Sequence, residues 1–320
     1  MRAFLHQRWF LFALLGVLLA GILRPASMRP LVGWLPGDVV VVAAVTFIMA
    51  LPLETSALWR TVRRPGPAWL AAGLNSGVAP LLGWLASRPL PPELAVGVIV
   101  ATIVPCTLAT AAVWTRRAGG NDAVAFLVTM ITSLACFLVV PGWLWLLVGI
   151  RADINYGHIV WGLIVSVVLP IVAAQLLRQW KSIGSWATRR KHVLSTAAQI
   201  GVLVMVLVGA VGCGEKLQGV SDGSVLSARN LAIMILAVTA VHVLLLTLGW
   251  ALSTTALQFN RADAIAVAFS GSQKTLMVGA YIALVVGPLA ILPMVAYHAA
   301  QLIVDTLVAD WWRGRGEGQA

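Results

Sequence analysis

Charged residues are scarce in this chain of 320 residues. They make up 10% of it, whereas a soluble globular domain carries about 25%. Acidic side chains are the scarcest, with 11 Asp and Glu against 22 Lys and Arg, while hydrophobic residues make up 60% and the mean hydropathy is +0.93. A water-soluble fold cannot bury that much apolar surface, so the composition excludes an ordinary soluble domain and predicts an integral membrane protein.

Cysteine is also rare, and the metalloprotease motif and paired metal-binding aspartates are missing. The three cysteines, Cys106, Cys136 and Cys213, lie in or at the end of apolar runs without CxxC or Cys/His spacing, so we expect neither disulfides nor a bound metal. The sequence has no HExxH and no paired Asp at metal-ligand spacing, and we therefore do not expect an enzyme. The basic residues form short clusters between apolar runs rather than a stripe, so the expected partners are membrane lipid and a small molecule, not nucleic acid.

Apolar runs that can cross a membrane recur along nearly the whole chain. A hydrocarbon core of about 30 Å needs about 20 helical residues. The sequence predicts ten transmembrane helices, at 9–24, 38–53, 67–86, 93–115, 122–149, 158–178, 193–212, 230–252, 262–285 and 288–309. Ten helices leave no room for a soluble domain, so we expect residues 1–320 to form one transmembrane domain. No small-x-small cleavage site follows the first run, which is expected to be a retained helix.

The basic residues also predict the orientation. Fifteen of them fall at the two termini and in the loops near residues 60, 116, 189 and 261, while six fall in the loops of the opposite face. Positive charge marks the cytoplasmic side. We therefore predict a multi-pass protein of the cell (inner) membrane with both termini in the cytoplasm.

A boundary near residues 150–157 separates two halves, 9–149 and 158–309, with five predicted helices each. An odd number of helices gives the halves opposite orientations, as in inverted-repeat transporters whose sites form from interrupted helices. The penultimate helix of each half is interrupted, by Pro105 among threonines in the fourth and by small and polar residues at 269–275 in the ninth. These are either the halves of one crossing site or simple kinks of the kind that Pro and Gly cause in membrane helices.

Five segments resemble the SBF-like branch of the bile acid:sodium symporter family. They are residues 47–54, 104–107, 118–123, 268–279 and 292–302. The resemblance implies an all-α fold of ten transmembrane helices in two inverted five-helix repeats, with core and panel domains and crossing discontinuous fourth and ninth helices. It also implies a sodium site near the crossing. Gly271 and Gln273 match the ninth-helix motif of that site, but its acidic position is Phe269 and a lysine, Lys274, follows the glutamine.

Lys274 is the most informative single residue, because an ammonium near mid-membrane costs about 2.5 to 3.5 kcal/mol. Its charge either takes the place of a sodium ion, binds an anionic substrate, or is a paired structural charge. Gln273 beside it is a site amide or an interhelix link. Thr129, Thr132 and Ser133 share one face of the fifth helix, where their hydroxyls suit a cation or substrate or else bond their own helix carbonyls.

The other candidate site residues surround the two interruptions. They are Ser270, Gly271 and Ser272 in the ninth helix, Pro105, Thr107 and Thr110 in the fourth, and Asn75 in the third. In the tenth helix His298, Gln301 and Asp305 follow one another at one-turn intervals, which fits a proton relay or ordinary packing. His242 stands alone in the eighth helix and is interpreted as structural.

The sequence thus predicts a secondary active transporter of a small anionic organic solute, with a proton or sodium as coupling ion and no other cofactor. Sodium independence is the more specific expectation, since Phe269 supplies no oxygen ligand and Lys274 repels a second cation. Two alternatives remain. The first is an arsenite or other anion efflux permease of the same superfamily, because arsenite permeases resemble this chain in having a cysteine in the fourth helix, here Cys106, and a thiolate suits As(III). The second is a non-transporting membrane regulator built on the same scaffold.

Overall fold

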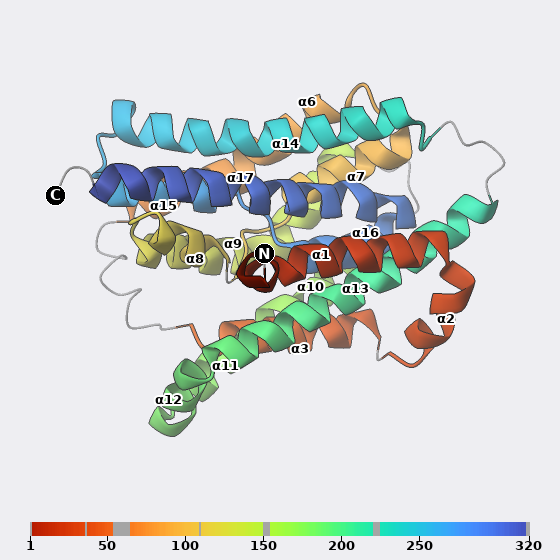
Figure 1. The fold of residues 1–320 in the computed structure, drawn as a ribbon, viewed down its shortest axis with the longest axis horizontal. Coiled ribbons are helices and arrows are strands. Elements are labelled where there is room, and N and C mark those ends of the chain that lie inside the picture. Colours follow the sequence, from red (N-terminus) through yellow and green to blue (C-terminus); the bar gives the residue numbers. More distant parts are fainter. Residues whose placement is uncertain are drawn as a thin grey trace.

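The computed structural model describes residues 2–35, 37–53, 65–108, 110–149, 154–219 and 225–317, and over these residues it contains helices and no strand (Figure 1). The elements of the first half are α1 (Arg2–Leu23), α2 (Pro25–Gly33), α3 (Asp38–Ala50), α5 (Gly66–Gly73), η1 (Leu74–Val78), α6 (Ala79–Ser87), α7 (Pro92–Ile103), α8 (Thr110–Arg117) and α9 (Asp122–Leu147). Those of the second half are α10 (Tyr156–Leu163), η2 (Ile164–Val168), α11 (Leu169–Arg178), α12 (Lys181–Arg189), α13 (Lys191–Gly219), α14 (Ala228–Ala251), η3 (Leu252–Ala256), α15 (Arg261–Ser272), α16 (Leu276–Val286), η4 (Pro288–Ala290) and α17 (Ile291–Glu317).

Within the described ranges, six stretches of helix are long and apolar enough to cross a membrane, as expected of a multi-pass membrane protein. They are Gly66–Ser87, Asp122–Leu147, Tyr156–Arg178, Lys191–Gln218, Ala228–Ala256 and Pro288–Gly314. A seventh span is possible if α1 and α2, which are bent by 109° at their junction, are counted together. Helices α3 and α7 are apolar but shorter. The two runs for which the sequence predicted an interruption, 93–115 and 262–285, are each divided into two helices.

Turns of π-helix widen three of the long helices, and prolines explain two of them. The π-helical turns η1 and η2 end just before Pro80 and Pro170 respectively. A proline ring clashes with the carbonyl four residues earlier and cannot donate to it, so the turn before it opens. At η1 the carbonyl concerned belongs to Ser76, and it accepts the indole N–H of Trp143 at 2.7 Å. The same wide turn carries Asn75 into the interior, where it is fully buried.

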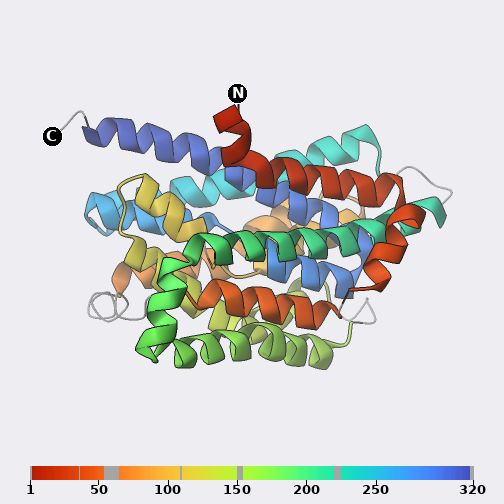
Figure 2. The ribbon, with the colours of Figure 1, turned by 60° about the horizontal axis from the view of Figure 1, so that its bottom comes forward.

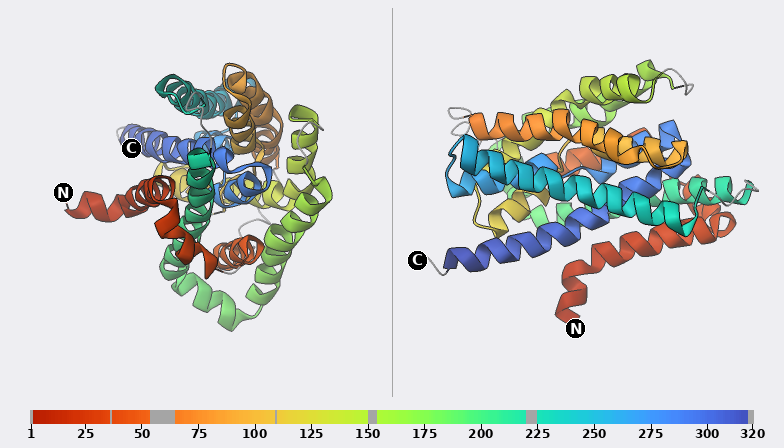
Figure 3. Two further views of the ribbon diagram at one scale, coloured as in Figure 1. Left: turned by 90° about the vertical axis from the view of Figure 1, so that its right-hand side faces the viewer. Right: turned by 90° about the horizontal axis from the view of Figure 1, so that it is seen from above.

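The helices pack in two groups, which we call the core bundle (α5–α9 and α14–α17) and the panel layer (α1–α3 and α10–α13). Within the core bundle α14 packs on α15 and α17, and α15 on α5 and α9; within the panel layer α13 packs on α1 and α3, and α3 on α11. In Figure 1 most of the core bundle lies above α1, α3, α11 and α13, and Figure 3 (left) shows the two groups along the long axis. Helix α12 joins α11 to α13 at one end of the panel layer (Figure 2). Both interrupted helices belong to the core bundle.

Candidate functional site

The first interruption lies between α7 and α8. Val104 is extended, with φ −69° and ψ 156°, because the residue before a proline is kept out of the helical region. Pro105 has no N–H, and the N–H of Cys106 donates to the Thr132 hydroxyl of α9 at 3.2 Å instead of to a carbonyl of its own helix. The Thr132 hydroxyl of α9 therefore accepts a backbone N–H that the break has left without a partner in its own helix.

The second interruption, between α15 and α16, consists of Gln273, Lys274 and Thr275. The sequence predicted an interruption over residues 269–275, and the structure confines it to the last three of these, since Gly271 still lies in the last turn of α15. The hydroxyls of Ser270 and Ser272 donate to the carbonyls four residues earlier, at 2.5 Å and 2.9 Å, so these side chains bond within the helix instead of competing with it. The helix consequently continues one residue beyond Gly271, to Ser272.

Side chains of other helices satisfy the carbonyls at the end of α15, which have no partner within the helix. Asn75 Nδ2 donates to the carbonyl oxygens of Ser270 and Gln273, at 3.2 Å and 2.8 Å. The Tyr297 hydroxyl of α17 donates to the carbonyl of Ser272 at 2.8 Å. Irregular backbone inside a membrane protein requires such hydrogen-bond partners. Here the donors come from η1 and α17, and the acceptors lie at the end of α15.

The two interruptions touch each other. The N–H of Thr275 donates to the carbonyl oxygen of Pro105 at 2.9 Å. Between them and α17, the side-chain amide of Gln301 brackets the backbone of Lys274, accepting its N–H at 2.9 Å and donating to its carbonyl at 3.1 Å. The backbone of the second break is therefore fixed on both sides.

Lys274 is fully buried at this junction. Its ammonium Nζ donates to the carbonyl oxygen and the side-chain Oδ1 of Asn75, at 2.6 Å and 3.2 Å, and to the carbonyl oxygen of Val104 at 3.0 Å. Three donors thus meet three acceptors, all of them uncharged. Among the described residues no carboxylate forms an ion pair with Lys274, so this charge of the second half of the chain is held by neutral oxygens of the first half.

Gln273 is the centre of a second buried network beside Lys274. Its Oε1 lies 2.8 Å from the Thr107 hydroxyl and 3.0 Å from that of Thr110, and these two hydroxyls are 2.7 Å apart. Its Nε2 donates to Asp305 Oδ2 of α17 at 2.6 Å. The other carboxylate oxygen of Asp305 lies 2.9 Å from His242 Nε2 of α14, and both residues are fully buried. The Gln273 amide therefore connects the end of α15 to α8 and α17 directly, and to α14 through Asp305.

The hydroxyl residues of the fifth predicted helix, now α9, have mixed roles. Thr129 donates to the carbonyl of Thr107 in the first break at 2.9 Å and lies 3.0 Å from the carbonyl of Ala125 in its own helix. Thr132 donates to its own helix while it accepts the N–H of Cys106. Ser133 is buried on the same helix. Thr129 and Thr132 therefore bond carbonyl oxygens of their own helix and also support the first break.

His298 lies outside the two networks. Its Nδ1 is 2.8 Å from Gln301 Nε2, and its ring packs edge-on against Phe10 of α1, with centroids 6.0 Å apart. His298 therefore contacts the second break through Gln301 and also through the backbone of Lys274. At Gly271 a Cβ would meet the Leu74 side chain at 3.4 Å, an ordinary contact distance, so the packing there does not require glycine.

Two interior residues matter more than the sequence suggested. His242 was interpreted as an isolated structural histidine, yet it pairs with Asp305, which is 63 positions away. Asp305 was grouped with His298 along one helix face, whereas the structure connects it to Gln273 and His242 instead. The signal available in the sequence was that each is a single ionisable residue inside an apolar run.

The junction of the two breaks is closed. None of the candidate residues lines either of two cavities that lie toward the opposite ends of α9, one of about 600 Å³ beside its first residues and one of about 330 Å³ beside its last. The buried networks around Lys274 and Gln273 lie between these two ends of α9. Thr129 and Thr132 of α9 bond the backbone of the first break there.

Comparison with known proteins agrees with this architecture. The model of the SBF-like CPA transporter family matches residues 8–314. The uncharacterized protein PA2026 of Pseudomonas aeruginosa is 29% identical over 75% of this chain and 73% of its own length. Sodium/bile acid cotransporter 7-B of Xenopus laevis is 23% identical over 95% of this chain and 91% of its own length. With a family match over almost its entire length, the chain belongs to the SBF-like CPA transporter family.

Proposed function

We propose that this protein is a secondary active transporter of a small organic anion that works without sodium. The observation that carries the proposal is the position of Lys274, whose ammonium is held by three neutral oxygens where the two interrupted helices touch. An ordered cluster of carbonyl and amide oxygens around one positive charge is the environment that a bound alkali cation would need. In this chain the cation is part of the protein.

The organisation proposed for the chain follows the inverted-repeat transporters. The repeats are residues 9–149 and 158–309, ten helices in all, and the core bundle moves against the panel layer. Both termini lie in the cytoplasm of a cell whose inner membrane holds the protein. The contact between the two breaks and the separation into two groups of helices support this arrangement.

A proton is the coupling ion in this proposal, and Lys274 carries it, as ionisable groups inside membrane proteins commonly do. Other titratable groups surround Lys274 and belong to the same buried region. They are Cys106 in the first break, His242 of α14, and Tyr297, His298 and Asp305 of α17. Asp305 and His242 are the pair most directly connected to the second break, through Gln273 and the carbonyl of Ser272.

The test is uptake by the purified protein in proteoliposomes. A set of radiolabelled organic anions is offered with sodium or choline as the external cation, and with or without an imposed pH gradient. The proposal expects uptake of at least one anion that responds to the pH gradient and is the same in sodium and choline. No uptake of any anion would favour a regulator over a carrier, and uptake that requires sodium would contradict the role given to Lys274.

A further inference from the structure

Helix α12 (Lys181–Arg189) lies where the chain turns between two membrane-spanning stretches. The stretch Tyr156–Arg178 ends just before it, and the stretch Lys191–Gln218 begins just after it. Figure 2 shows α12 running across the ends of α11 and α13 instead of continuing either of them. A short helix in this position lies at the level of the lipid headgroups, with its axis along the membrane surface.

Contacts with Arg178 fix α12 to the rest of the panel layer. The guanidinium of Arg178, at the end of α11, donates to the carbonyl oxygen of Leu51 at 2.9 Å and to the Thr188 hydroxyl at 3.1 Å. A Cβ at Gly184 would lie 2.9 Å from the carbonyl oxygen of Arg178, so α12 packs closely on the end of α11. Gly184 and Ala187 are buried on this inner side. The helix therefore has a defined inner side and a defined outer side.

The outer side of α12 carries Ser182, Trp186, Arg189 and Arg190. Their spacing of four, seven and eight residues from the first to the others places them on one helical face, and all four are exposed. Trp186 is 47% exposed. Among the described residues no carboxylate forms an ion pair with Arg189 or Arg190. We call these four residues the outer face of α12; it combines two unpaired cations with a large amphipathic ring and a hydroxyl.

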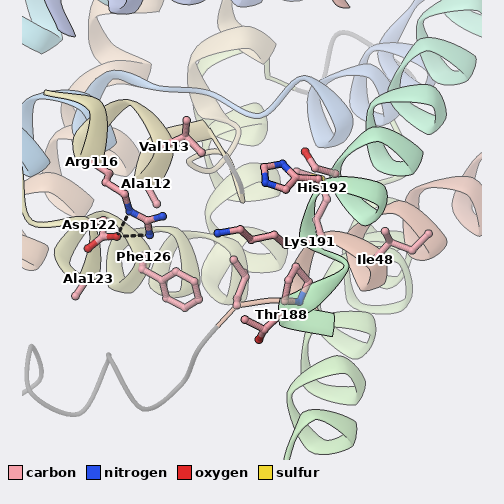
Figure 4. A pocket seen from close by; sticks show the side chains of 14 residues that line it. Ile48, Ala112, Val113, Arg116, Asp122, Ala123, Phe126, Thr188, Lys191 and His192 are labelled. Carbon is pink, nitrogen blue, oxygen red and sulfur yellow. Dashed lines mark hydrogen bonds and ion pairs between the residues drawn. The ribbon is translucent and has the colours of Figure 1, made fainter. Parts of the chain in front are cut away.

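The charge around the outer face has one sign. No Asp or Glu occurs from residue 154 to residue 214. The next lysine along the chain, Lys191, does not add to this face, because its side chain extends into the larger cavity toward Arg116 (Figure 4). The two arginines before it are thus left without a counter-ion from this part of the chain.

An anionic phospholipid headgroup matches this combination of groups. A guanidinium binds phosphate well, because its planar set of donors fits two phosphate oxygens at once. An indole ring is favourable at the boundary between headgroups and acyl chains, where its apolar body and its N–H both find suitable surroundings. A signal for membrane orientation alone would need the positive charges but not the exposed tryptophan on the same face.

We propose that the outer face of α12 binds the headgroup of an anionic phospholipid, with Arg189 and Arg190 on its phosphate and Trp186 against the upper part of its acyl chains. The lipid belongs to the leaflet that α12 faces. Because Arg178 fixes α12 to α3 and α11, the bound lipid anchors the panel layer in that leaflet. This binding is independent of the proposed transport.

The experiment places a reporter on α12 of the full-length protein. Since Cys106, Cys136 and Cys213 are buried, a cysteine introduced at the exposed position 185 by Ser185→Cys can be labelled selectively with nitrobenzoxadiazole, whose emission rises in apolar surroundings. The labelled protein in dodecyl maltoside is titrated with dioleoyl-phosphatidylglycerol or with dioleoyl-phosphatidylcholine. Phosphatidylglycerol should raise the emission at an about twenty-fivefold lower concentration, fivefold for each arginine near the lipid.

Variants in the same labelled background identify the residues responsible. Arg189→Gln combined with Arg190→Gln should remove the difference between the two lipids, and Arg190→Gln alone should reduce it about fivefold. Arg189→Lys combined with Arg190→Lys keeps both charges and should keep most of the difference. The matched control, Arg88→Gln combined with Arg229→Gln, removes two exposed charges from loops of the opposite face and should leave the difference unchanged. Thermal unfolding confirms that each variant is folded.

Three results would overturn the assignment. The first is an equal response to the two lipids, which would show that the headgroup charge is not recognised. The second is an equal loss in the arginine pair and in the matched control, which would reduce the effect to net charge. The third is emission in phosphatidylglycerol liposomes that a nitroxide on the lipid headgroup does not quench. That result would place α12 away from the bilayer and assign its outer face to a soluble acidic partner.

Discussion

Replacement of Lys274 by Met tests the role of the built-in cation. The variant removes the only charge from the cluster formed by Asn75 Oδ1 and the carbonyl oxygens of Asn75 and Val104. Any pH dependence carried by Lys274 should disappear, because Met has no proton to exchange. Sodium should remain without effect, since Phe269 stands at the acidic position and the cluster lacks a carboxylate.

The structure gives the size of the barrier to sodium in the unaltered protein. A sodium ion that shared the oxygens around Lys274 would lie within about 4 Å of Nζ, where two unit charges repel by about 4 kcal/mol at an effective dielectric near 20. That energy corresponds to about a thousandfold weaker binding. Neutral ligands alone are not expected to offset a penalty of this size, so sodium should not bind beside Gln273 while Lys274 is charged.

The assay is proteoliposome uptake at a series of pH values, with sodium replaced by choline at constant ionic strength. Thermal unfolding is recorded in parallel, because Met leaves three buried acceptors without their donor, at about 1 to 3 kcal/mol each. Lys274→Gln also cannot exchange a proton but still donates through its amide, and it keeps the test valid if the Met variant does not fold. Lys181→Met is the matched control at an exposed position. A steep rise of wild-type uptake with sodium, or unchanged pH dependence in folded Lys274 variants, would refute the reasoning.

Three further predictions concern stability and topology. Asp305→Asn breaks a buried pair and should lower the free energy of unfolding by about 3 to 5 kcal/mol, whereas Asp310→Asn on the same helix removes a half-exposed pair worth about 0 to 1 kcal/mol; equal shifts in melting temperature would contradict the assigned network. Gly97→Ala should destabilise by about 1 to 3 kcal/mol, because its Cβ would lie 2.8 Å from the backbone of Ala290, whereas Gly73→Ala meets nothing within 4 Å and should be neutral or stabilising in chemical denaturation. Reporter fusions near residue 155 and at residue 320 should report opposite sides of the membrane, and a cytoplasmic signal from the first would show that the predicted number of helices is wrong.

The membrane class and the approximate helix positions could be predicted from the sequence alone. Apolar runs of membrane-spanning length are a local property, and the composition left no soluble alternative. Pro105 marked the first break because a proline acts on its immediate neighbours. The second break was predicted over residues 269–275 and is confined to residues 273–275, since Gly271 weakens a helix only if nothing else supports the turn, and the serines on either side of it bond within the helix.

The partners of the buried polar groups were decided only by the tertiary structure. No sequence spacing indicates that Lys274 would be held by Asn75, 199 positions away, or that His242 would pair with Asp305. The cavity that brings Lys191 to the Arg116–Asp122 pair likewise combines two groups of helices. The hydropathy of a segment depends only on its own residues, so membrane-spanning helices can be predicted from the sequence. The partners of buried polar and charged side chains depend on which helices become neighbours in the folded bundle.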